Sequence, residues 1–153
     1  MSFKIEHRVG VQAPPSVVWD ILADLSGWSS WNPLYPSVEG QMKIGEKLTV
    51  TLAIPGNPPE TINPVVVDWV PHMQFVWRLK ALGGLVKTVR YMEIEPLADG
   101  EASVFSHGES FEGLAADFMP KALRKQIKQG FIAMSEAMQK EAHRRVGRAD
   151  IAG

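Results

Sequence analysis

Residues 117–144, DFMPKALRKQIKQGFIAMSEAMQKEAHR, contain the pattern that decides the fold of this chain. Apolar residues recur there mostly at every third or fourth position, as they do on the buried face of an α-helix. These apolar positions are Phe118, Ala122, Leu123, Ile127, Phe131, Met134, Met138 and Ala142. Basic and polar residues cover the other faces, so the pattern predicts one long amphipathic helix with Asp117 as its N-terminal cap. A single apolar helix face must be buried against other elements, which the rest of the chain has to supply.

The sequence before this helix predicts an antiparallel sheet. In the first eleven residues Phe3, Ile5, His7, Val9 and Val11 alternate with mostly polar residues, as in a half-buried strand. Turn-forming residues then divide the chain into six further predicted strands. These strands are residues 38–44, 47–54, 61–70, 74–81, 85–95 and 102–111. Because proline cannot donate to a sheet ladder, Pro64 is expected at a strand start, an edge or a bulge.

Two short helices are predicted after the first strand. Apolar residues from Val17 to Leu25 have helical spacing, which Pro15 or Ser16 can open and Gly27 can close. The two tryptophans of the following stretch, residues 28–33, lie among turn-forming residues, which favours a second short helical turn.

Composition limits the class of protein. The 153 residues are 45% hydrophobic and 22% charged, which is typical of one folded domain. We therefore expect a single domain over residues 1–146 and a frayed tail over residues 147–153. A net charge of -1 gives no general attraction to nucleic acid, and the absence of cysteine excludes disulfides. Neither a signal peptide nor a membrane-spanning run is recognisable, so we expect a cytoplasmic protein without integral membrane association.

The order of strand, two short helices, six strands and a long helix is that of the α+β helix-grip fold. The chain resembles the superfamily of START lipid-transfer domains, pollen-allergen-like proteins and polyketide cyclases (SRPBCC). The local match is to its bacterial polyketide cyclase/dehydrase branch and rests on residues 13–24, APPSVVWDILAD, on Trp28-x-x-Trp31-Asn32-Pro33, and on His107-x-Glu109-x-Phe111-x-Gly113. The resemblance implies a curved, seven-stranded antiparallel sheet wrapped around the long helix, with an apolar cavity for a small hydrophobic ligand.

The sharpest group of polar residues lies on the last two predicted strands. His107 and Glu109 share a parity with Phe105 and Phe111, so all four are expected to face the cavity. The family pattern suggests that Arg90 also faces inward, where it can pair with Glu109 across the hairpin. We interpret this pair as a structural ion pair, with His107 hydrogen-bonded near the cavity mouth. The alternative is that these three residues orient a polar ligand end or transfer a proton at a carbonyl group.

The expected ligand-binding residues combine this polar group with the aromatic and apolar residues around it. They are Trp28, Trp31, Phe75, Trp77, Arg90, Met92, Phe105, His107, Glu109, Phe111, Phe118, Phe131 and Met134. Trp28 and Trp31 fit a cavity lid and plain core equally well. The four histidines lack a metal-ligand spacing, so neither a metal nor a cofactor is expected.

The leading function is binding or transport of a small hydrophobic molecule such as a lipid, a polyketide or an aromatic metabolite. The first alternative is a polyketide cyclase or dehydratase in which His107 or Glu109 acts as acid or base and Arg90 polarises a carbonyl group. The second alternative is a co-chaperone or antitoxin-like interaction module, since the same scaffold carries many functions. The sequence leaves ligand identity open, and a homodimer remains an option.

Overall fold

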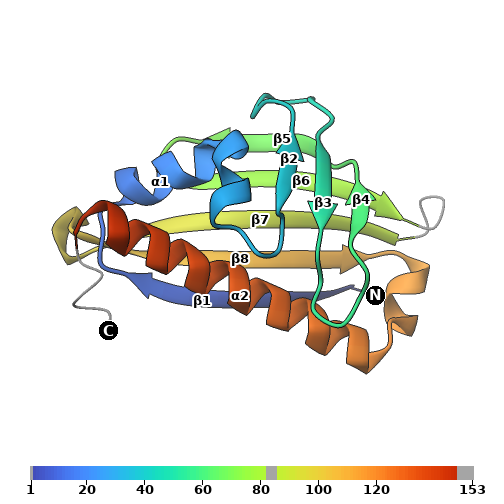
Figure 1. Cartoon of the computed structure of the whole chain (residues 1–153). Helices are drawn as coiled ribbons and strands as arrows, with labels where there is room; N and C mark the ends of the chain where they lie inside the picture. The colour runs from blue at the N-terminus through green and yellow to red at the C-terminus, as the bar shows by residue number, and fades with distance from the viewer. Residues whose placement is uncertain (1, 82–85, 148–153) are drawn as a thin grey trace.

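The computed structural model describes residues 2–81 and 86–147, which form two antiparallel sheets and two α-helices (Figure 1). The larger sheet has the strand order β1-β8-β7-β6-β5, and the smaller has the order β2-β3-β4. The larger sheet consists of β1 Ser2–Val11, β5 Val65–Val70, β6 Gln74–Ala81, β7 Val86–Leu97 and β8 Ala102–Glu112. The smaller sheet consists of β2 Ser37–Glu39, β3 Thr49–Leu52 and β4 Glu60–Ile62.

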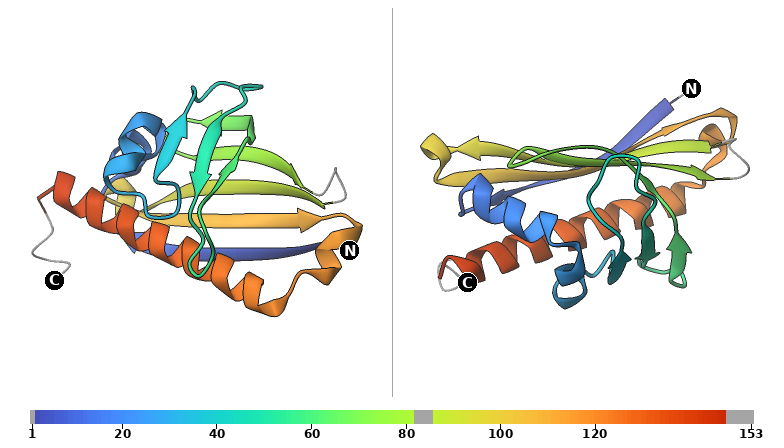
Figure 2. Two further views of the ribbon diagram at one scale, coloured as in Figure 1. Left: turned by 45° about the vertical axis from the view of Figure 1, so that its right-hand side comes forward. Right: turned by 90° about the horizontal axis from the view of Figure 1, so that it is seen from above.

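The helices and the small sheet lie on the same side of the curved five-stranded sheet (Figure 2). The α-helices are α1 Pro15–Ala23 and α2 Lys121–Arg145. Shorter 3-10 helices are η1 Leu25–Ser30, η3 Ala98–Gly100 and η4 Leu114–Phe118. This arrangement confirms the predicted helix-grip fold.

The predicted strand count is wrong, because the expected strand over residues 61–70 divides into β4 and β5. Pro64 lies at the division and directly precedes β5, which is the edge strand of the five-stranded sheet. This is the position expected for a residue that cannot donate to a ladder. The strand predicted over residues 38–44 ends early, since Gly40 has a φ of 125° and Gly45 a φ of 86°. The described residues thus contain eight strands in two sheets rather than seven in one.

Two predicted helix boundaries are also wrong. The long helix begins at Lys121, so Asp117 and Phe118 belong to η4 and Asp117 is not the cap. Pro120 explains the boundary, because the residue before a proline is disfavoured in helical conformation and Met119 is extended. The first short helix ends at Ala23 instead of Gly27, which lies inside η1.

The core lies between the five-stranded sheet and the C-terminal two thirds of α2. The buried face of this helix runs from Ile127 to His143, and α1 contributes Val18, Ile21 and Leu22. The predicted stripe is therefore confirmed from Ile127 onward. Within the described residues, no helix has both the length and the apolar composition needed to cross a membrane.

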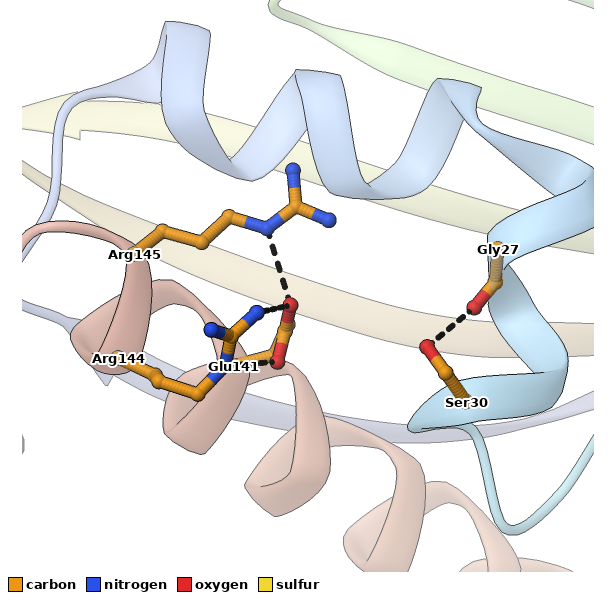
Figure 3. A network of polar contacts seen from close by, with 5 residues as sticks. All are labelled: Gly27, Ser30, Glu141, Arg144 and Arg145. Atoms are coloured by element: carbon orange, nitrogen blue, oxygen red, sulfur yellow. Dashed lines mark hydrogen bonds and ion pairs between the residues drawn. The ribbon is translucent and has the colours of Figure 1, made fainter.

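The last turn of α2 carries a cluster of charges on the surface (Figure 3). Glu141 accepts hydrogen bonds from Arg144 at 2.7 Å and from Arg145 at 3.0 Å. Cations near a helix C-terminus interact favourably with its dipole. His143 Nε2, near the same helix end, accepts a hydrogen bond from the backbone N–H of Gln12 at 2.9 Å.

Candidate ligand-binding site

A cavity of about 460 Å³ lies between the five-stranded sheet, the small sheet and the N-terminal half of α2. Its lining residues are Leu52, Ile54, Asn57, Pro58, Pro59, Glu60, Leu79, Thr88, Arg90, Glu109, Phe111, Met119, Leu123 and Ile127. Residues 57–59 of the loop before β4 and Glu60 at the start of β4 are exposed, whereas Thr88, Arg90 and Glu109 are buried. The cavity therefore has an outer rim at this loop and a polar inner wall on β7 and β8.

The inner wall contains the predicted ion pair. Arg90 and Glu109 are directly opposite each other in the β7–β8 register, and Arg90 Nη2 lies 2.6 Å from Glu109 Oε1. Both side chains are almost completely buried. A charge at such a depth is stable only when it is paired and hydrogen-bonded, so each residue depends on the other.

Tyr35 connects this ion pair to His107. Arg90 Nη1 donates a hydrogen bond to the Tyr35 hydroxyl at 2.8 Å, and the same hydroxyl lies 3.0 Å from His107 Nε2. Since Arg90 can only donate, the Tyr35 hydroxyl accepts from Arg90 and can donate its own proton to His107. The ring of Phe131 packs edge-on against His107, with centroids 4.1 Å apart. Four buried polar residues thus form one continuous network.

Burial sets the protonation states in this network. It raises the pKa of the Tyr35 hydroxyl, an effect that the nearby Arg90 charge only partly opposes. Burial also lowers the pKa of His107 well below its ordinary value, and the positive charge of Arg90 acts in the same direction. His107 is therefore neutral at pH 7, and the Tyr35 hydroxyl keeps its proton.

Two polar atoms on the inner wall have no partner among the described residues. They are Thr88 Oγ1 and Arg90 Nε, and both side chains line the cavity. An unsatisfied buried polar group costs free energy, which a ligand atom can recover by bonding to it. Thr88 can donate or accept, and Arg90 Nε can only donate. A ligand oxygen that accepts hydrogen bonds fits both atoms.

The other predicted site residues lie mostly in the core. Of the thirteen, Arg90, Glu109 and Phe111 line the cavity. Those that are at least 99% buried in the core and do not line it are Trp28, Phe75, Trp77, Met92, Phe105, His107, Phe131 and Met134. His107 is thus an interior residue, not one near the cavity mouth.

The predicted lid residues are packed rather than open. Trp28 is fully buried and its Nε1 donates a hydrogen bond to the Leu22 carbonyl at 3.0 Å. Trp31 is half-buried and packs edge-on against Trp28. Phe118 is 83% exposed, because it lies in η4 before the helix on whose buried face it was expected.

Several lining residues were missed although the sequence carried a signal for them. Leu123 and Ile127 belong to the apolar stripe of α2, and Thr88 shares the strand parity of Arg90. Tyr35 had no such signal, because it lies in an irregular segment between η1 and β2. Its place is fixed by Asn32, whose Oδ1 accepts the backbone N–H groups of Leu34 and Tyr35, both at 3.0 Å.

Several solved structures have the same fold as this chain. The Zhui aromatase/cyclase from Streptomyces is 22% identical and superimposes with a TM-score of 0.74, over 95% of this chain and 96% of that one. A START superfamily protein from Mycobacterium smegmatis is 15% identical with a TM-score of 0.73, over 93% and 98% of the two chains. Norcoclaurine synthase from Thalictrum flavum is 13% identical with a TM-score of 0.68, over 95% and 97%. At these identities the likeness establishes the fold alone.

The sequence itself matches one family model over most of its length. No curated protein sequence is a significant match to this chain. The family described as polyketide cyclase/dehydrase and lipid transport matches residues 2–139, which include the cavity and the buried polar network. The chain therefore belongs to the polyketide cyclase/dehydrase and lipid transport family.

Proposed function

We propose that this protein binds or carries a small hydrophobic molecule, such as a lipid, a polyketide or an aromatic metabolite, in the cavity between α2 and the sheets. The observation that carries the proposal is the pairing of a mainly apolar cavity of about 460 Å³ with two unpartnered polar atoms, on Thr88 and Arg90, at its inner wall. Ligand pockets typically have about this size and few polar groups. The ligand is oriented with its polar oxygen toward Thr88 and Arg90.

A cavity-filling substitution tests the proposal. Leu123 is half-buried and lines the cavity, so Leu123→Trp should fill it and abolish the binding of a neutral apolar dye such as Nile red. Ile132→Trp is the matched control, because Ile132 is half-buried on the same helix but does not line the cavity. Dye fluorescence should titrate normally for the parent chain and the control. Equal dye binding by all three proteins would contradict the proposal.

A second candidate function is a cyclase or dehydratase acting on a polyketide-like substrate. It is favoured by the Glu109 carboxylate, which lines the cavity beside the Arg90 guanidinium. In this function Arg90 polarises a substrate carbonyl and Glu109 moves a proton as acid or base. Of the two candidate acid/base residues, only Glu109 is placed for such chemistry, since His107 lies outside the cavity lining and is connected to it only through Tyr35 and Arg90.

Mass spectrometry distinguishes the two functions. Compounds extracted from the purified protein, and a polyketide-like probe incubated with it, should be recovered unchanged if the protein only binds them. A product lighter by one water, or an isomer of the probe with a different retention time, that is lost in Glu109→Gln would establish the dehydratase or the cyclase instead.

A further inference from the structure

A second hollow, of about 600 Å³, lies at the corner where β4, the start of β5 and the end of β6 meet. Its lining residues are Lys47, Glu60, Thr61, Ile62, Asn63, Val65, Arg78, Leu79 and Lys80. Three of these side chains are cations, and Glu60 is the one carboxylate among them. The hollow is therefore net positive in a protein whose overall charge is -1.

Strand pairing places the three cations on one face of the sheet. Lys47 forms a bridge with Val65, and Val65 is directly opposite Arg78 on β6. Residues directly opposite each other in a sheet point to the same face, as do residues two positions apart on a strand. Lys80 therefore points to the same face as Arg78. That face is the outer one, because Leu79 between them lines the cavity, and Trp77 and Val66, which share its face, are buried in the core.

Among the described residues, no carboxylate forms an ion pair with these cations, and Glu60 in the same hollow is itself unpaired. In the described part of the chain, Lys47, Arg78 and Lys80 form no ion pair or side-chain hydrogen bond. The strand neighbours of Arg78 are Val65 and Val89, and the residue opposite Lys80 is Lys87. Neither neighbourhood supplies a carboxylate to the hollow. An anion would relieve this accumulation of like charge.

The hollow adjoins the cavity proposed above. Glu60 and Leu79 line both, so these two side chains form the boundary between them. We propose that the hollow binds the anionic group, a carboxylate or a phosphate, of an amphiphilic ligand whose apolar part occupies the cavity. This inference rests on the proposed binding function and adds the charge of the ligand to it.

Exposed cations are sufficient to bind the anionic group because this group is covalently joined to the apolar part of the ligand. Each pair between a free anion and an exposed lysine contributes little, because water and salt screen it. An anionic group that is covalently joined to a body already held in the cavity loses little further freedom on binding. The hollow should therefore distinguish an anionic amphiphile from its neutral analogue, while binding a small free anion weakly.

Displacement of Nile red by decanoate and by decanol, at pH 8 and low salt, tests the inference. The triple variant Lys47→Gln, Arg78→Gln, Lys80→Gln should lower the affinity for decanoate about tenfold, since it removes three exposed charge interactions. Decanol should displace the dye equally well from the parent and the variant. Raising the salt concentration should lower the affinity for decanoate but not the affinity for decanol. The matched control is Lys43→Gln, Lys125→Gln, Lys140→Gln, which removes the same charge from exposed positions outside both hollows.

Each outcome has a separate meaning. If both compounds displace the dye and neither triple variant changes the affinity for decanoate, the anionic site is overturned and the hydrophobic cavity stands. The same conclusion follows if the control variant loses as much affinity for decanoate as the test variant. It also follows if acetate competes with decanoate for binding as effectively as decanol competes. If neither compound displaces the dye and Leu123→Trp leaves dye binding intact, the proposed function itself is wrong.

Discussion

Arg90 is the residue on which the polar wall of the cavity depends. Its guanidinium group is buried and bonds to Glu109 and Tyr35, while its Nε has no protein partner. A pair that is buried in this way contributes little net stability compared with apolar residues, but removing one partner strands the other charge. Substitutions around Arg90 can therefore separate structural from ligand-binding roles.

Replacement of Glu109 by Gln should lower the free energy of unfolding by about 3 kcal/mol, because it leaves the buried Arg90 charge without its counter-ion. Urea denaturation measures the change. Glu101→Gln removes an exposed carboxylate and should change stability by less than about 0.5 kcal/mol. A loss for Glu109→Gln as small as that of the control would contradict the importance of the ion pair. Unchanged affinity for the ligand in the destabilised variant would exclude Glu109 from binding.

Replacement of Tyr35 by Phe tests the hydroxyl that joins Arg90 to His107. The change leaves one buried donor of Arg90 and Nε2 of His107 without partners, so a loss of about 2 kcal/mol is expected. Tyr91→Phe is the matched control, since its hydroxyl donates to Glu6 on the partly exposed outer face of the sheet. Thermal or urea unfolding should show a smaller loss for Tyr91→Phe. Equal losses of stability in the two variants would show that the buried network contributes no more than a hydrogen bond on the outer face.

The neutral state of His107 predicts a pH dependence of stability. Burial, followed by the Arg90 charge, holds the pKa of His107 well below its ordinary value of 6.5. As the pH falls below 6.5 the unfolded chain takes up a proton at this residue and the folded chain does not, so the free energy of unfolding decreases. The contribution is fully present above pH 6.5 and is lost as the pH falls toward the folded-state pKa.

Urea unfolding between pH 7.5 and pH 5 measures this contribution. His107→Gln should reduce the slope by up to about 1.4 kcal/mol per pH unit, the value for one proton. His72→Gln, at an exposed turn residue, is the matched control. An unchanged slope in His107→Gln would mean that the folded protein protonates His107 as readily as the unfolded chain.

At the scale of elements, the two C-terminal strands were the most predictable part of the site. Alternation along β7 and β8, together with a tight hairpin, fixes their register, so Arg90 and Glu109 could be paired from the sequence. Tyr35 could not, because its segment has no period and its place depends on the side chain of Asn32. Most of the predicted aromatic residues face inward as expected. Periodicity reports the buried face, however, and does not separate core from cavity lining.

The outer face of the same strands offers a test of the register. A Cβ atom on Gly108 would lie 2.2 Å from Cζ of Tyr91, the residue opposite it on β7. Gly108→Ala should therefore displace the tyrosine ring, break its hydrogen bond to Glu6, and cost about 1–3 kcal/mol. In a Tyr91→Ala background, Gly108→Ala should lower the free energy of unfolding much less. Additive effects in this double-mutant cycle would contradict the pairing of Gly108 with Tyr91.

At the scale of the whole molecule, the two halves of α2 have different surroundings. The C-terminal part packs into the core through Met134, Met138 and Ala142, whereas Leu123 and Ile127 face the cavity. The helix thus packs into the core at its C-terminal end and helps to enclose the ligand cavity at its N-terminal end. The apolar stripe predicted the helix. The cavity, however, depends on the position of the small sheet, which the periodicity of the sequence does not determine.

A crystal structure with a bound hydrophobic ligand, recovered from the purified protein or supplied as decanol, is the most direct test of the central claim. The account predicts that the apolar part of the ligand lies against Leu123 and Ile127, with its oxygen within hydrogen-bond distance of Thr88 Oγ1 or Arg90 Nε. A ligand bound outside this cavity, or one whose oxygen points away from both atoms, would contradict it.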